Sequence, residues 1–147
     1  MEKNRKNLRD MSGLVLFCTL LSAIRLISDS LALDFNIQNL PADVTEGLAA
    51  VSRIVLCVIG FILLLPQVYM GVKGIKLSKK PDASKGHIVW AIILTVMTAI
   101  AIYTPVSDII AGVQVGANIM ELVIMAVDIL LFVTYAVCAK RVQKDAK

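Results

Sequence analysis

The sequence predicts an all-α integral membrane protein, a four-helix bundle, and three observations lead to this fold class. Hydrophobic residues make up 58% of the 147 residues, against roughly 45 to 50% in ordinary soluble domains. Four long apolar segments follow one another, and basic residues are concentrated at their edges. A soluble domain of this size leaves roughly a third of its unfolded surface in water, so lipid must cover the excess apolar surface.

The four apolar segments define the predicted membrane spans. They cover residues 11–33, 48–72, 87–103 and 115–139. A helix rises about 1.5 Å per residue, so about 20 apolar residues cross a hydrocarbon core roughly 30 Å thick. The first, second and fourth segments exceed this length, and the third is the shortest. We therefore expect a single transmembrane domain, residues 1–147, with four spans.

Turn-forming residues separate the spans. The first loop, 34–43, is rich in Asp and Asn, and polar residues at its end are suited to cap the next helix. The second loop, 78–86, contains Pro81 and several lysines that exclude it from hydrocarbon. A shorter break is expected at 104–108, around Pro105.

Basic residues predict the orientation of the spans. The loops after the first and third spans contain no Lys or Arg. Because Lys and Arg are enriched in cytoplasmic loops, we expect both termini and the middle loop in the cytoplasm. The residues that carry this prediction are Lys3, Arg5, Lys6, Arg9, Lys73, Lys76, Lys79, Lys80, Lys85, Lys140, Arg141, Lys144 and Lys147.

A cleaved signal peptide is the alternative interpretation of the first segment. A basic start, an apolar run over 14–24 and Ser30-Leu31-Ala32 as a small-residue cleavage site are typical of one. That interpretation leaves three spans. Arg25 and Asp29 fit it poorly, so we favour four.

The segments also suggest two tandem helix hairpins. When Arg53 is aligned with Glu121, Lys73 falls on Arg141. The second and fourth segments carry similar apolar runs between these positions. A hairpin repeated in the same orientation, as in some transporters, produces this pattern. Apolar helices also resemble one another by chance, so the duplication is a hypothesis.

Small and polar residues recur every three or four positions along each span, which is the spacing of one helix face. In lipid such faces are where helices meet, because the hydrophobic effect does not drive helices together there. We therefore expect a compact bundle with a partly polar interior. The candidate intramembrane polar site comprises Arg25, Asp29, Arg53, Gly60, Asp108, Glu121 and Asp128.

Two opposite-charge pairs are available at matched depth in the membrane. Counting residues from the cytoplasmic flank places Arg25 at the depth of Asp128 and Arg53 at the depth of Glu121. A charge near the bilayer centre costs about 2.5 to 3.5 kcal/mol on insertion scales, which makes Arg25 and Asp128 the costly residues. They form either an ion, proton or substrate site, or a structural contact within the bundle or with a partner. A solvated outer rim is expected for Asp29, Arg53, Asp108 and Glu121.

Pro66 and Gln67 mark a candidate kink in the second span, because proline removes one backbone hydrogen bond. The kink belongs either to a gate or to an ordinary membrane proline. Gly71 and Gly74 predict close helix contact. His87, the single histidine, is expected at the membrane edge as an anchor.

Catalysis has little support in the sequence. It contains no metal-ligand cluster, P-loop or Gly-x-Ser-x-Gly motif, and Cys18, Cys57 and Cys138 stand singly in apolar runs. We therefore expect no catalytic residues, no cofactor and no metal. An enzyme acting on a lipid or quinone is the weakest hypothesis. Nucleic acid is not an expected partner, because the basic residues flank spans and do not alternate with aromatics.

The leading hypothesis is a small non-enzymatic membrane protein that acts as an accessory subunit or scaffold. It would work through helix–helix association with other membrane subunits or with itself. The alternative is a transporter or channel component that uses Arg25 and Asp128. In both cases the lipid bilayer surrounds the protein, and we expect the plasma membrane of a prokaryote.

Overall fold

The described residues fold into helices, as predicted. The computed structural model describes residues 2–32, 42–80 and 84–145, with side chains from residue 46 onward in the second range. Among these residues, four helical stretches are long and apolar enough to cross a membrane. The protein is therefore a multi-pass integral membrane four-helix bundle. Its helices are α1 (Glu2–Ala32), α2 (Ala42–Lys79), α3 (Gly86–Ala101), α4 (Tyr103–Ile110) and α5 (Val115–Asp145), with α3 and α4 forming one span.

Three helices are longer than the apolar segments that predicted them. α1 begins at Glu2, α2 continues to Lys79 and α5 continues to Asp145. The added turns are rich in Lys and Arg, which are good helix formers, and they carry the helices beyond the apolar segments. Most of the predicted loop at 34–43 lies outside the described residues, as does part of the loop at 78–86.

The break predicted at 104–108 is wrong, because these residues belong to α4. The interruption falls at Ile102, between α3 and α4. Pro105 has no backbone N–H to donate to the carbonyl of Ala101, so the helical hydrogen-bond ladder lacks one bond at this junction. The proline itself lies in the first turn of α4, where a helix tolerates a missing N–H. The disruption therefore precedes the proline instead of surrounding it.

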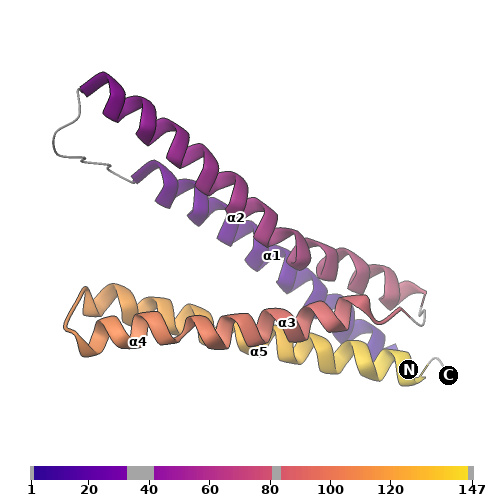
Figure 1. The fold of residues 1–147 in the computed structure, drawn as a ribbon. Coiled ribbons are helices and arrows are strands. Elements are labelled where there is room, and N and C mark those ends of the chain that lie inside the picture. The colour runs from indigo at the N-terminus through magenta and orange to yellow at the C-terminus, as the bar shows by residue number, and fades with distance from the viewer. Residues whose placement is uncertain (1, 33–41, 81–83, 146–147) are drawn as a thin grey trace.

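Two antiparallel hairpins make up the bundle; they meet at one end and diverge at the other (Figure 1). α1 packs along α2, and α3 and α4 pack along α5. We call the end where α1 begins and α5 ends the basic end, and the opposite end the far end. At the basic end, Asn4 Nδ2 donates to Asp145 Oδ2 (2.7 Å) and Gln143 Nε2 donates to the Ser84 carbonyl. The cytoplasmic location of the basic end stays a prediction.

The buried apolar core lies toward the basic end, so the bundle is not compact along its whole length as expected. Toward the far end, large apolar side chains of α1, α2 and α5 are exposed, including Leu31, Ile54 and Val123. In a membrane these side chains face lipid tails or the space between the hairpins. The buried core consists of Leu8, Val15, Met70, Leu77, Ala91, Leu131, Phe132, Tyr135, Ala139 and Val142.

Two glycines allow the close packing at the basic end. A Cβ at Gly71 would lie 2.6 Å from Leu16 Cδ2 on α1. A Cβ at Gly74 would lie 2.8 Å from Tyr135 Cε2 on α5 and would also collide with Ser12 Oγ on α1. Real side chains do not approach so closely, so α1 and α5 reach α2 only because these positions are glycine. The predicted close contact at Gly71 and Gly74 is confirmed.

Tyr135 and His87 are two residues with polar groups in this packed region. Tyr135 Oη donates to the Met70 carbonyl at 2.7 Å. The rings of His87 and Tyr135 meet edge to face, with centroids 6.1 Å apart and planes at 89°. Both side chains are fully buried. The expected role of His87 as an anchor at the membrane edge is therefore wrong, because the first turn of α3 packs its histidine against α5 instead of lipid.

Candidate functional site

A cavity of about 520 Å³ lies between α1 and α5. It is on the far-end side of the buried core, where the two hairpins diverge. We call it the interhelix cavity. Apolar side chains such as Leu21 and Val127 form much of its lining. Its polar lining residues are Cys18, Ser22, Arg25, Asp29, Glu121 and Asp128.

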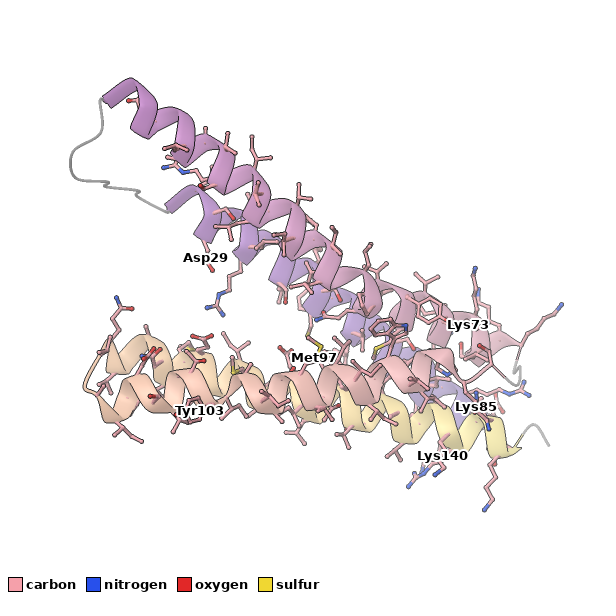
Figure 2. All side chains as sticks on the ribbon, viewed as in Figure 1. Asp29, Lys73, Lys85, Met97, Tyr103 and Lys140 are labelled. Carbon is pink, nitrogen blue, oxygen red and sulfur yellow. The ribbon has the colours of Figure 1, made fainter. Side chains whose placement is uncertain are left out.

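One face of α1 supplies four of these six polar residues. Cys18, Ser22, Arg25 and Asp29 recur every three or four residues and therefore point to the same side of the helix. Arg25 Nε lies 3.3 Å from Asp29 Oδ2, an ion pair one turn apart. Both side chains are more than half exposed, at 52% and 66%. Figure 2 shows Asp29 on the side of α1 that faces the other hairpin, whereas Lys73, Lys85 and Lys140 lie toward the basic end.

The ion pair expected between Arg25 and Asp128 is not formed among the described residues, and Arg25 pairs with Asp29 instead. Arg25 and Asp128 do line the same cavity. However, α1 and α5 belong to hairpins that diverge here, whereas Asp29 follows Arg25 by one turn on the same helix. Within the described ranges, Arg53 and Glu121 also form no ion pair with each other, because Arg53 lies on α2 and does not line this cavity. Matched depth is not sufficient for pairing.

α5 supplies two half-buried carboxyl groups, Glu121 and Asp128. Within the described part of the chain, neither makes an ion pair or a hydrogen bond. Their neighbours in the lining include Ile124 and Met125, which offer no hydrogen-bond donor from their side chains. A carboxylate in apolar surroundings needs a donor or a cation. Among the residues that the structure describes, no cation forms an ion pair with the α5 side of the cavity.

The remaining predicted site residues do not line the interhelix cavity. Arg53 is half-buried on α2, and Asp108 is half-buried on α4. Gly60 faces α1, where a Cβ would lie 2.6 Å from Leu26 Cδ1. It makes room for helix contact and not for an ion pair. Of the predicted set, the cavity gathers Arg25, Asp29, Glu121 and Asp128.

α2 runs on as a helix through Pro66, and whether a kink occurs there stays a prediction. Gln67 contacts α1, because Thr19 Oγ1 lies 3.1 Å from Gln67 Oε1. The same hydroxyl donates to the Val15 carbonyl at 2.7 Å. A half-turn of the amide presents its NH₂ to Thr19, so that each group has a partner. The helical spacing places Gln67 on the bundle-facing side of α2, but it did not identify Thr19 on α1 as its partner.

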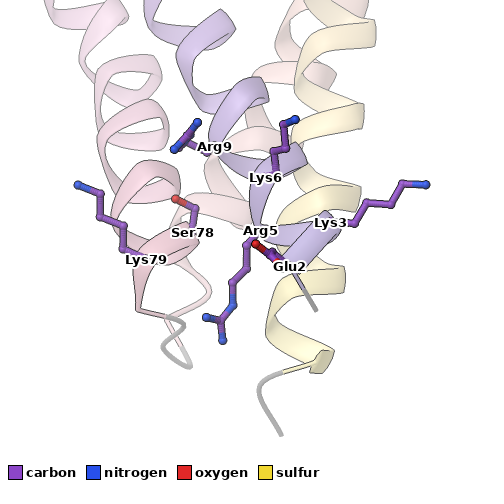
Figure 3. Close-up of a pocket in the computed structure, with 7 residues that line it drawn as sticks. All are labelled: Glu2, Lys3, Arg5, Lys6, Arg9, Ser78 and Lys79. Carbon is purple, nitrogen blue, oxygen red and sulfur yellow. The ribbon is translucent and has the colours of Figure 1, made fainter.

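A second cavity, of about 590 Å³, lies at the basic end between the start of α1 and the end of α2 (Figure 3). We call it the basic pocket. Its cations were predicted only to set the membrane orientation, and their shared cavity was not predicted. An antiparallel hairpin brings the start of its first helix beside the end of its second. The basic residues at these two ends were therefore the signal in the sequence that could have predicted the pocket. The residues that line it are Glu2, Lys3, Arg5, Lys6, Arg9, Ser78 and Lys79.

Neither cavity brings together a recognised set of metal ligands. Among the residues that the structure describes, no three His, Cys, Asp or Glu side chains lie close enough to share a metal ion, and the expected lack of a metal or cofactor stays a prediction. The chain matches no protein-family model, no curated protein and no solved structure. Its function must therefore be inferred from the two cavities.

Proposed function

We propose that this protein is a non-enzymatic accessory subunit or scaffold that receives a membrane helix of a partner protein at the interhelix cavity. A cationic side chain on that helix would meet Glu121 and Asp128. The observation that carries the proposal is that these two half-buried carboxyl groups line a largely apolar cavity and have no ion pair among the described residues.

Lipid tails cannot satisfy these carboxyl groups. A charged side chain near the bilayer centre costs about 2.5 to 3.5 kcal/mol on insertion scales. Arg25 is the cation of the cavity and already pairs with Asp29. Three carboxyl groups against one guanidinium leave the cavity acidic. A Lys or Arg on an incoming helix would offset the cost, because intramembrane charges are stable when paired.

The apolar lining supports a helix as the occupant. Leu21 on α1 and Val127 on α5 are 50% and 52% exposed although both line the cavity. About half of the surface of each side chain is therefore not covered by the protein's own helices. Packing of side chains and interhelical polar contacts drive helix association in lipid. A third helix in this position would supply both.

Photo-crosslinking in native membranes tests this proposal. A photoreactive amino acid replaces Met125, which lines the cavity, or Val133, which is exposed on α5 outside it. We expect a crosslinked product of defined mass from the Met125 position alone. Addition of Asp128→Asn should lower the yield of that crosslink about tenfold, which corresponds to a loss of roughly 1.4 kcal/mol in binding free energy. Crosslinks to lipid alone from both positions would contradict the proposal, and an unchanged crosslink in Asp128→Asn would remove its electrostatic part.

A transporter or channel component is the second candidate, and one observation favours it. The core closes the basic end, while the cavity lies toward the diverging end. A site open to one side of the membrane has this arrangement. Its volume of about 520 Å³ is within the roughly 300 to 1,000 Å³ that small-molecule sites occupy. The cation would then be a substrate and not a partner's side chain.

Cys18 distinguishes the two candidates, because it is a native thiol in the cavity lining. In a Cys57→Ser, Cys138→Ser background it is the single cysteine. A charged, membrane-impermeant thiol reagent modifies it rapidly only if water fills the cavity. Rapid modification together with liposome flux that Asp128→Asn abolishes supports transport. An unreactive Cys18 in native membranes, with flux unaffected by Asp128→Asn, supports the partner helix.

We also propose that the protein resides in the plasma membrane of a prokaryote. Its four apolar helical stretches require a bilayer, and basic residues gathered at one end suit a membrane with a defined cytoplasmic face. Fractionation of cells that express a tagged chain, with a reporter fused after α5, tests both the compartment and the orientation. If the reporter is of a kind that is active only outside the cytoplasm, activity of the fusion would contradict the predicted orientation.

A further inference from the structure

The basic pocket concentrates positive charge more than membrane orientation requires. The positive-inside rule asks for cations on one side of the bilayer, but not in one cavity. Arg141 and Lys144, at the same end on α5, do not line the pocket. The cations that do line it are Lys3, Arg5, Lys6, Arg9 and Lys79.

Helix packing holds these cations together. Leu8 on α1 and Leu77 on α2 are both buried in the core, so the start of α1 lies against the end of α2. Figure 3 shows Ser78 between Arg5 and Arg9, with Lys79 beside it. Ser78 itself is buried, and its hydroxyl donates to the Ile75 carbonyl at 2.7 Å. It forms part of the wall, while the cations provide the charge.

The protein does little to neutralise this charge. Among the residues that line the pocket, Glu2 is the one carboxyl. Arg9 Nε lies 3.9 Å from Asp10 Oδ1. Within the described residues, Arg5 and Lys6 form no ion pair or hydrogen bond through their side chains. Like charges that line one pocket repel one another, and a bound anion relieves that repulsion. The unpaired N–H groups at the start of α1 also favour negative charge there.

We propose that the basic pocket binds a phosphate-bearing anion at the membrane surface. Arg and Lys are the side chains that recognise phosphate, and arginine can donate two parallel hydrogen bonds to it. A basic pocket between helices at a membrane surface suits the headgroup of an anionic phospholipid, and a soluble phosphate compound has the same chemistry. This site is separate from the interhelix cavity, so it does not depend on the proposed function.

Calorimetric titration of the purified full-length protein in a neutral detergent tests the proposal. The probes are dihexanoyl phosphatidylglycerol, dihexanoyl phosphatidylcholine as a zwitterionic control, and inorganic pyrophosphate. Arg5→Gln with Lys6→Gln removes two pocket cations. Arg141→Gln with Lys144→Gln removes the same charge at the same end, outside the pocket. We expect about 10- to 30-fold weaker binding in the first variant, as for two headgroup-facing cations, and less than about a twofold change in the second.

The source of the phosphate follows from the probes. Binding of phosphatidylglycerol but not pyrophosphate assigns a lipid headgroup, and pyrophosphate that competes with it assigns a soluble phosphate compound. If neither anion binds, or if both double variants lose the same affinity, the proposal that the basic pocket binds phosphate is overturned. Glu2→Gln controls for misfolding, because a misfolded variant would not gain affinity. It removes the single carboxyl in the lining, so anion binding must become several-fold stronger. Unchanged or weaker binding in Glu2→Gln would also overturn it.

Discussion

Gly74 is the point where α1, α2 and α5 come together. In Gly74→Ala, the new methyl group lies 2.8 Å from Tyr135 Cε2 and 2.9 Å from Tyr135 Oη, and it also collides with Ser12 Oγ. Tyr135 is fully buried, and its Oη donates to the Met70 carbonyl at 2.7 Å. The ring therefore cannot move away without losing that hydrogen bond. We expect the joint between the two hairpins to loosen.

The size of the effect follows from three contributions. Overpacking a filled core costs about 1 to 3 kcal/mol. Loss of a hydrogen bond between membrane helices costs about 0.6 kcal/mol on average and up to about 1.7 kcal/mol. The better helix propensity of alanine returns about 0.5 to 1 kcal/mol. Together they predict that Gly74→Ala lowers the free energy of unfolding by about 1 to 4 kcal/mol.

Unfolding in mixed micelles by SDS titration measures this loss. Gly13→Ala on α1 is the matched control, because a Cβ there meets nothing within 4 Å, and its stability should be unchanged or slightly raised. Tyr135→Phe should cost about 0.6 to 1.7 kcal/mol alone. It should add little to Gly74→Ala, in which the same hydrogen bond is already broken. If Gly74→Ala is as stable as Gly13→Ala, the packing of α5 against α2 described above is refuted.

Three further measurements test other contacts. Gln67→Leu and Thr19→Val should show a coupling free energy of about 0.6 to 1.7 kcal/mol in a double-mutant cycle, because their side chains meet at 3.1 Å; additive effects would exclude the contact. Asn4→Asp places a second carboxylate beside Asp145, where Asn4 Nδ2 now donates at 2.7 Å, so stability should fall at neutral pH and recover as acid protonates one carboxylate. Thermal melts should show no such recovery for Asn4→Ala. Asp128→Asn should not destabilise the isolated protein, because Asp128 has no ion pair among the described residues; a loss of 3 kcal/mol or more, about the cost of breaking a buried pair, would show that one exists.

Part of the interhelix cavity was predictable because a helix repeats its face every three to four residues. That period places Ser22, Arg25 and Asp29 together on α1, and Glu121 and Asp128 together on α5, as the cavity lining shows. Depth along the membrane also follows from counting residues. Lateral distance does not, because it depends on the angle between two helices. For this reason the matched depth of Arg25 and Asp128 does not make them an ion pair among the described residues, and Arg25 pairs with Asp29.

The amino-acid sequence alone determined the helical class and the number of spans. Both follow from local apolar length, since lipid requires about 20 consecutive apolar residues and leaves no backbone group unpaired. The tertiary structure decided what depends on contact between distant segments. Gly71 and Gly74 bring α2 into close contact at the basic end, while the hairpins diverge at the far end. This arrangement buries His87 against Tyr135, opens the interhelix cavity, and gathers the cations of α1 beside Lys79.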